Sequence, residues 1–242
     1  MSMNIHSDRC VALVIAVMAT LLLMALGIAV LLAATTETLI ATGFGRGHEA
    51  VYAADAIVER GLDDLQSVGD WNRVLDGSVR SSFVDGAAAG GRGLGDGAVV
   101  DVAQVANLAN CQKTSPCTGA EMNQITTERP WAANNPRWTP YAYGYLRDLL
   151  PPGSIDSPLY VVLLVGDDPA ENDNDPATDG ADPLNPGSGR IALRAEAFGP
   201  RGAHKVVEAT IARTAAPDSD RVQIPGQSLA EQRLSLASGG VR

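Results

Sequence analysis

Positive charge is scarce in this sequence. There are 18 Lys and Arg residues against 28 Asp and Glu residues, which gives a formal net charge of −10. The excess of acid lies beyond residue 34, because residues 1–34 contain one charge of each sign, Asp8 and Arg9. An acidic surface repels the phosphate backbone, and no basic stripe with interleaved aromatic residues offsets it. We therefore expect no nucleic-acid partner.

The sequence also lacks the motifs that mark common catalytic sites. It contains no nucleophile elbow, no phosphate-binding P-loop, no dinucleotide-binding fingerprint and no metalloprotease helix. Histidine is rare, with three residues in the chain, so a histidine-based centre would have to use His48 or His204. We expect both at the surface. These absences favour a protein that is not an enzyme.

Only three cysteines are present, Cys10, Cys111 and Cys117. The last two are six residues apart in the stretch NCQKTSPCTG and form either a small disulfide loop or half of a metal site. A zinc site would need two further Cys or His ligands nearby, which this part of the sequence lacks. The disulfide is favoured if the domain lies in an oxidising compartment, and closing so short a loop would stabilise the fold by about 2 kcal/mol.

Residues 11–34 form a long apolar run, and no charged residue lies between Arg9 and Glu37. As a helix this run is about 36 Å long, which exceeds the roughly 30 Å of a bilayer's hydrocarbon core. The apolar part of a signal peptide is shorter, about 7–15 residues, although LAATTET offers a weak cleavage site and leaves that alternative open. A retained transmembrane helix is favoured, with the N-terminal tip in the cytoplasm.

A second helical pattern follows the apolar run without an intervening proline. Its apolar stripe consists of Ala50, Ala53, Ala54, Ile57, Leu62 and Leu65. Gly43, Gly45 and Gly47 stand between the two patterns, and each glycine costs a helix interior about 1 kcal/mol relative to alanine. Two interpretations remain open: a break between an anchor and a separate helix, or a soft point within one long helix.

The N-terminal residues resemble the type IV pilus minor pilins of the PilX type. That family has Arg-Gly before Ala-Leu-Val and, about forty residues on, Ala-x-x-Ala-Ala-Glu-Ala. The corresponding residues are Arg9-Cys10, Ala12-Leu13-Val14 and the stretch AVYAADA at residues 50–56. The resemblance covers residues 8–66. Beyond them the order of features is similar: DWNRVLDG, the cysteine loop, a Trp-bearing helical segment running to LLPPG, a strand, an acidic loop and a terminal hairpin.

The resemblance implies a structural subunit that is stored in the inner membrane, with its C-terminal domain in the periplasm, and assembled into a pilus. Its expected partners are other pilins, pilus-assembly membrane proteins, membrane lipid and a prepilin peptidase. The peptidase is expected to cleave between Cys10 and Val11, and Arg9 is the basic residue that precedes this site. The fifth mature residue is then Ile15, where major pilins have a glutamate, and this departure indicates a tip or initiation subunit. The residues expected to pack or position the filament helix are Ile15, Ala16, Ala19, Gly27, Ala53, Ala54 and Asp55.

Two alternatives to this function remain. The chain could be a GspK-like pseudopilin of type II secretion, a class that also lacks the glutamate. It could instead be a plain single-pass membrane protein whose ectodomain binds calcium or another ligand.

The expected fold is α+β and pilin-like, with a long N-terminal transmembrane and amphipathic helix packed on a small antiparallel sheet. Its parts are a leader at residues 1–10, a helix at 11–67, a globular domain at 68–213 and a polar, mostly disordered tail at 214–242. Within the domain, residues 87–97 are a flexible connection. Strands are predicted at residues 98–105, 158–165, 190–197 and 204–213, with the second the most buried and FGPRGAH as a hairpin turn between the last two.

Two clusters of side chains remain as candidate binding sites. One is a cluster of aromatic residues, which either fill the core or form an exposed patch that binds a partner. Its members are Trp131, Trp138, Tyr141, Tyr143 and Tyr145. The other is the acidic stretch at residues 166–187, which has seven carboxylates and no Lys or Arg. It is either a solvated loop or a loop ordered by calcium, the one cofactor that the sequence suggests. The calcium ligands would be Asp173, Asp175, Asp179 and Asp182.

Overall fold

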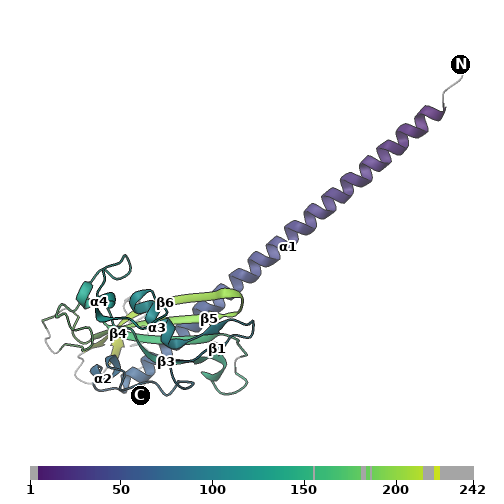
Figure 1. Ribbon diagram of the computed structural model, residues 1–242. Helices are drawn as coiled ribbons and strands as arrows, with labels where there is room; N and C mark the ends of the chain where they lie inside the picture. The colour runs from purple at the N-terminus through teal and green to yellow at the C-terminus, as the bar shows by residue number, and fades with distance from the viewer. Residues whose placement is uncertain (1–4, 155, 181–183, 186, 215–220, 224–242) are drawn as a thin grey trace, which may run out of the picture. The chain divides into compact units, whose positions relative to one another are not determined.

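The structure is a computed structural model that describes residues 5–154, 156–180, 184–185, 187–214 and 221–223 (Figure 1). The chain divides into two compact units, Met1–Arg46 and Gly47–Arg242. The described part of the first unit consists of the N-terminal portion of one helix. The second unit contains the rest of that helix, a five-stranded sheet and several short elements.

Helix α1, Ile5–Gln66, is a single helix of 62 residues. It begins inside the predicted leader, whose first four residues lie outside the described part of the chain. It continues without interruption through the three glycines, so the interpretation of a break at this point is wrong. A long helix tolerates such residues because stopping would leave four carbonyls and four amides without partners. Within the described part of the chain, packing does not require glycine at two of these positions, since a Cβ added at Gly43 or Gly45 would meet nothing within 4 Å.

The sheet is an antiparallel meander with strand order β3-β4-β5-β6-β7. Its strands are Thr139–Tyr145, Tyr160–Asp167, Arg190–Gly199, Ala203–Thr214 and Arg221–Gln223. The predictions for β4, β5 and β6 are confirmed to within three residues, and the 3-10 turn Pro200–Gly202 joins β5 to β6 as expected. Strand β7 lies within the predicted polar, mostly disordered tail, and residues 215–220 and 224–242 are outside the described part of the chain. An α+β layout with one long apolar helix and a small antiparallel sheet is therefore present.

Both faces of the sheet are covered. The face toward α1 buries apolar side chains that include Ala50, Ala53, Ala54, Ile57, Leu62, Leu65, Val161, Leu163, Val165, Leu193 and Ala195. The opposite face is covered by Leu94, Val100, Val102, Val105 and Ala106. Strand β4 is buried along its whole length, as predicted, because apolar side chains cover both faces of the sheet at this strand.

The prediction of a strand at residues 98–105 is wrong beyond its start. Only Val99–Val100 forms a strand, β2, which pairs with β1 at Arg92–Gly93. Asp101 then begins helix α3, Val102–Cys111, by accepting hydrogen bonds from the backbone amides of Ala103 and Gln104. Val102, Val105 and Ala106 are buried with helical spacing. Two further short helices, α2 at Asn72–Leu75 and α4 at Gly119–Met122, complete the described helical turns of this unit apart from 3-10 segments.

The predicted helical segment before LLPPG is also wrong, because residues 139–145 form strand β3. Two 3-10 turns flank it, Ala132–Asn134 and Leu146–Asp148. A register shift between Pro140 and Ala142 lets both Tyr141 and Ala142 contribute to the core beneath α1. Tyr143 packs on the opposite face and is fully buried. The aromatic cluster is thus mostly core, whereas Trp131 is 43% exposed.

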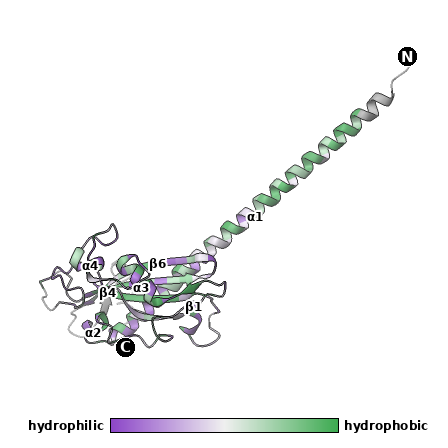
Figure 2. Cartoon of the chain, viewed as in Figure 1, coloured by the Kyte–Doolittle hydropathy of each residue, from purple (hydrophilic) through white to green (hydrophobic). Residues whose placement is uncertain are grey.

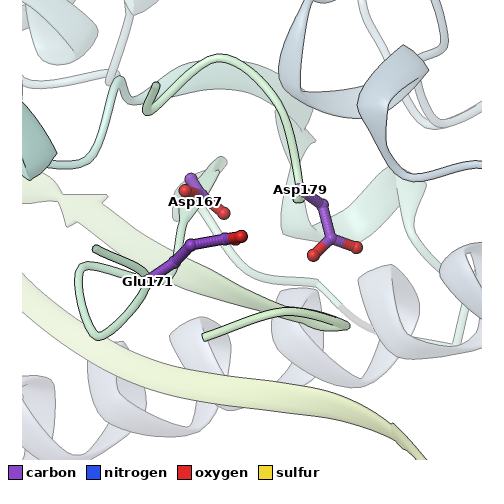
Figure 3. Close-up of side chains that lie close together, drawn as sticks. All are labelled: Asp167, Glu171 and Asp179. Atoms are coloured by element: carbon purple, nitrogen blue, oxygen red, sulfur yellow. The ribbon is translucent and has the colours of Figure 1, made fainter. Parts of the chain in front are cut away.

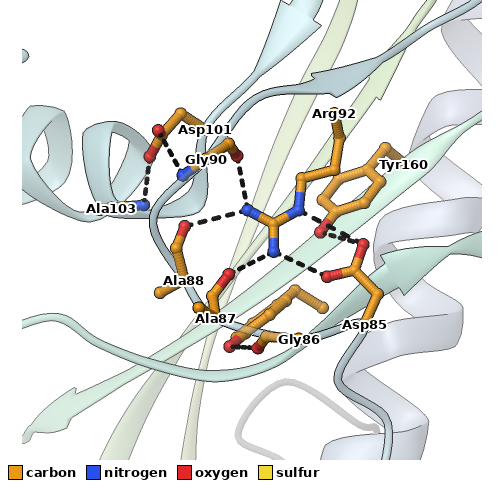
Figure 4. Close-up of polar contacts among 10 residues, drawn as sticks. Asp85, Gly86, Ala87, Ala88, Gly90, Arg92, Asp101, Ala103 and Tyr160 are labelled. Atoms are coloured by element: carbon orange, nitrogen blue, oxygen red, sulfur yellow. Dashed lines mark hydrogen bonds and ion pairs between the residues drawn. The ribbon is translucent and has the colours of Figure 1, made fainter.

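Residues 87–97 are held in place, contrary to the prediction of a flexible connection (Figure 4). The guanidinium of Arg92 pairs with Asp85 at 2.9 Å and donates hydrogen bonds to the carbonyls of Ala88 and Gly90. Asp85 also accepts a hydrogen bond of 3.0 Å from the hydroxyl of Tyr160 on β4. Arg92 thereby links a glycine-rich segment, through Asp85, to strand β4.

Gly61 sets the distance between α1 and the sheet. A Cβ built at this position would lie 2.3 Å from Cδ2 of Leu163, which is fully buried on β4. No side chain fits there unless Leu163 moves. The helix can approach β4 this closely only because residue 61 is glycine.

A double-mutant cycle tests this close approach. Gly61→Ala should destabilise the wild-type protein by about 1 kcal/mol, because overpacking outweighs the gain in helix propensity of about 1 kcal/mol. In a Leu163→Ala background the obstructing atom is gone, and the same substitution should stabilise by up to about 1 kcal/mol. Urea denaturation of the full chain in micelles, followed by tryptophan fluorescence, measures both. Equal effects in the two backgrounds would contradict the contact.

Candidate functional site

The first candidate site is the apolar half of α1. Among the described residues, one helix is long and apolar enough to cross a membrane, with an 18-residue window of mean hydropathy 2.8. The large apolar side chains from Val11 to Leu32 are each 50–68% exposed, on every side of the helix. Figure 2 shows this portion in predominantly hydrophobic colours. A helix that is apolar all round needs an apolar environment, which is either lipid or other chains.

The threonine hydroxyls of this half are satisfied within the helix. Its five threonines each donate the side-chain hydroxyl to a backbone carbonyl three or four residues earlier, at 2.7–3.0 Å: Thr20, Thr35, Thr36, Thr38 and Thr42. An unsatisfied hydroxyl is costly in hydrocarbon, and back-bonding to the helix removes that cost. The helix surface is therefore suited to an environment without water.

The predicted filament-packing residues fall into two groups. Ile15, Ala16, Ala19 and Gly27 lie in the exposed apolar half, where Ile15 is 62% exposed. Ala53 and Ala54 instead pack in the core of their own domain, so they are not available to a neighbouring chain.

The remaining predicted α1 site residues are Asp55 and the processing residues. Asp55 is exposed. At the processing site Val11 is exposed, and the side chains of Arg9 and Cys10 lie outside the described part of the structure.

Cys111 and Cys117 form the expected disulfide, with their Cα atoms 6.0 Å apart. Cys111 is the last residue of α3, and Cys117 comes just before Thr118, the N-cap of α4. The first turn of α4 has a capping box between Thr118 and Glu121. The ion pair with Lys113, followed by the hydrogen bond from Thr118, lowers the pKa of Glu121 to about 2. Both sulfurs are used in the bond, so the alternative of half a metal site is wrong.

The structure does not bring together the predicted calcium ligands of the acidic loop. Asp173 and Asp175 are exposed, and their carboxylates accept hydrogen bonds from local backbone amides at 2.8 and 3.4 Å. Asp182 lies outside the described residues. Only Asp179 of the predicted set takes part in a carboxylate cluster.

A different set of carboxylates converges, formed by Asp167, Glu171 and Asp179 (Figure 3). One oxygen from each lies within 4.8 Å of the others. Asp167 is the last residue of β4 and is 4% exposed, and Glu171 is 1% exposed. The sequence signal for Asp167 is its position at the end of the most apolar strand. No local pattern marks Glu171, because its burial depends on contacts with Gly180, Asn185 and Gly187.

Burial and mutual repulsion oppose ionisation in this cluster. Burial, followed by the charges of Glu171 and Asp179, raises the pKa of Asp167 to about 8. Burial is also the main cause that raises the pKa of Glu171 and that of Asp179. Three carboxylates with raised pKa values at one point mark a site where a cation would be stabilising.

Comparisons with protein-family models, with curated proteins and with solved structures find no match for this chain.

The raised pKa of Asp167 predicts an unusual pH dependence of stability. The folded carboxyl keeps its proton to about pH 8, whereas the unfolded carboxyl loses it near its ordinary value of 3.8. Between these values the unfolded state binds fewer protons, so the stability contributed by this group decreases as pH rises. With a chelator present, the Tm of the wild type should fall relative to that of Asp167→Asn from pH 5 to about pH 8. A relative rise of the wild type across this window would contradict the prediction.

Proposed function

We propose that the chain is a structural subunit of a pilin-like filament, a minor pilin or pilus-assembly protein with no catalytic role. Its apolar helix is stored in the inner membrane and later packs among similar helices in a filament. The sheet domain lies on the periplasmic side and, after assembly, on the filament surface. The disulfide supports this location, because such bonds persist in oxidising compartments.

The observation that carries the proposal is the continuity of α1. A membrane anchor needs about 20 residues, and α1 has 62, or roughly 90 Å of helix. Its first half exposes apolar side chains on all sides, while its second half is a core element of the sheet domain. A plain anchor does not need to continue as the helix that organises the ectodomain. A subunit whose helix joins a filament core does need this, because the helix must fix the domain's position on the filament.

The exposed half of α1 also has features suited to helix–helix packing. Lipid and leucine are equally apolar, so association in a membrane depends on close contact between small side chains. Ala16, Ala19 and Gly27 provide small residues in the exposed segment. With cleavage after Cys10, Ile15 is the fifth mature residue, where major pilins have a glutamate, and its apolar side chain supports a tip or initiation position and not the bulk of the filament.

The second candidate is a single-pass membrane protein with a cation-binding ectodomain. The carboxylate cluster at the end of β4 favours it, whereas the length of α1 does not. The two candidates differ in how the N-terminus is processed. Leader removal is expected only for the filament subunit, or for a pseudopilin of the same class.

Mass spectrometry of the protein from its native membranes separates the candidates. The proposed function predicts a mature chain that starts at an N-methylated Val11, and a deletion strain with reduced piliation or filament function. The reduction should be reversed by the wild-type gene supplied in trans. An N-terminus at Met1 or Ser2, together with normal filaments in the deletion strain, would contradict the proposal and favour the plain anchor.

A further inference from the structure

The carboxylate cluster of Asp167, Glu171 and Asp179 is built by the fold and is not a chance gathering on the surface. Gly187 packs directly on the backbone of Glu171, because a Cβ at residue 187 would lie 2.2 Å from the amide nitrogen of Glu171. The carboxylate of Glu171 accepts hydrogen bonds from the amide of Gly180 at 3.1 Å and from Nδ2 of Asn185 at 3.3 Å. The loop after β4 thus folds over Glu171 and buries its charge.

Asp179 is fixed at the other end of the same loop. Its backbone amide donates a hydrogen bond of 2.6 Å to Oδ1 of Asn72, and its carboxylate accepts one of 2.6 Å from the amide of Gly189. These contacts tie the loop to α2 and to the start of β5. They hold the third carboxylate next to the other two without contributing a positive charge.

One buried oxygen of this cluster is left without a partner. Oδ1 of Asp167 is inaccessible to solvent and makes no hydrogen bond within the part of the chain that the structure describes. Asp167 as a whole is only 4% exposed, and its carboxylate points toward those of Glu171 and Asp179 (Figure 3). A buried acceptor without a donor is costly, and a bound cation would remove that cost.

The basic side chain whose charge acts on this cluster makes its own contacts elsewhere. Arg213 acts on Asp179 only through its long-range charge. Its guanidinium donates a hydrogen bond of 2.6 Å to the carbonyl of Gly69 and lies over the ring of Trp71 at 4.3 Å. The cluster therefore has no ion-pair partner in the described protein.

We propose that Asp167, Glu171 and Asp179 bind a calcium ion. All three ligands are carboxylates, which are preferred by hard cations, and neither histidine nor cysteine takes part, as zinc would require. Oxygens bound to one calcium ion at about 2.3–2.6 Å lie at most roughly 5 Å apart, and the three carboxylate oxygens meet this limit because they lie within 4.8 Å of one another. Calcium also accepts irregular geometry with six to eight ligands, whereas magnesium demands near-ideal octahedral geometry at about 2.0–2.1 Å.

The bound ion would make the β4–β5 connection dependent on external calcium. It neutralises carboxylates from both ends of the loop and completes the coordination of the orphaned oxygen of Asp167. Asp173 lies beside the cluster, since the position of a Cβ on Gly180 is 1.8 Å from Oε1 of Glu171 and 3.3 Å from Oδ2 of Asp173. Water would fill the remaining positions of a six- to eight-coordinate ion.

Calorimetric titration and thermal melting of the full chain in chelator-treated detergent micelles test the proposal. Wild type should bind one calcium ion, and at a calcium concentration of about 100 times Kd its Tm should rise by roughly 5–10 °C. Asp167→Asn and Glu171→Gln should each weaken calcium binding by about tenfold or more, because ligand charge sets the affinity of such sites.

Asp175→Asn is the matched control. It removes the same charge from the same loop, but at an exposed position whose carboxylate makes only local turn contacts, so calcium affinity should stay within about twofold of wild type. Variants are compared only after circular dichroism shows native secondary structure, and Asp179→Asn replaces any that does not fold.

Three results would overturn the proposal. The first is a wild type with neither binding heat nor a Tm shift. The second is an Asp175→Asn variant that loses as much affinity as Asp167→Asn. The third is a magnesium response equal to or larger than that to calcium. None of these results bears on leader processing or piliation, so failure here is distinguishable from failure of the filament proposal.

Discussion

The close contact between helix α1 and strand β4 organises the globular unit. Gly61 lets the helix approach Leu163, and the apolar stripe from Ala50 to Leu65 then covers one face of the sheet. With that face closed, β4 can be apolar on both sides, because the opposite face is covered by α3 and by the segment that Arg92 fastens. The carboxylate cluster lies at the end of this same strand. Its geometry therefore depends on β4 being held firmly along its whole length.

The same helix has two chemically different halves, and this difference connects structure to the proposed function. From Gly47 onward, one face of α1 is buried by its own domain. In residues 11–34 the helix is apolar all round, and its threonine hydroxyls are bonded internally, so this part needs an environment supplied by lipid or by other chains. The three glycines stand at the boundary between the halves, where they lower helix stability without serving any packing contact at Gly43 or Gly45.

Periodicity in the sequence was sufficient to predict the elements with strong patterns. The stripe from Ala50 to Leu65, the apolar strand β4 and the β5–β6 hairpin were predictable because each has a local hydrophobic period or turn signal. Helix α3 was not predicted because apolar and polar residues alternate in VVDVAQV as they do in a strand. The capping hydrogen bonds of Asp101, which the pattern does not reveal, start a helix there. For the candidate site, acidity indicated a cation, but exposed residues such as Asp175 were indistinguishable in sequence from buried ones. The burial of Glu171 depends on Gly187 and Asn185, which a local pattern cannot reveal.

The central claim is that one continuous helix passes from an apolar environment into the core of a folded domain. Electron paramagnetic resonance of single spin labels along α1, in a Cys10→Ser background in lipid vesicles, tests it directly. Labels at Ala16, Ala19 and Ala25 should be accessible to oxygen and protected from a water-soluble nickel chelate, whereas a label at Asp55 should show the reverse. Access of the chelate throughout residues 11–34, or access that alternates with the helical period, would contradict the account.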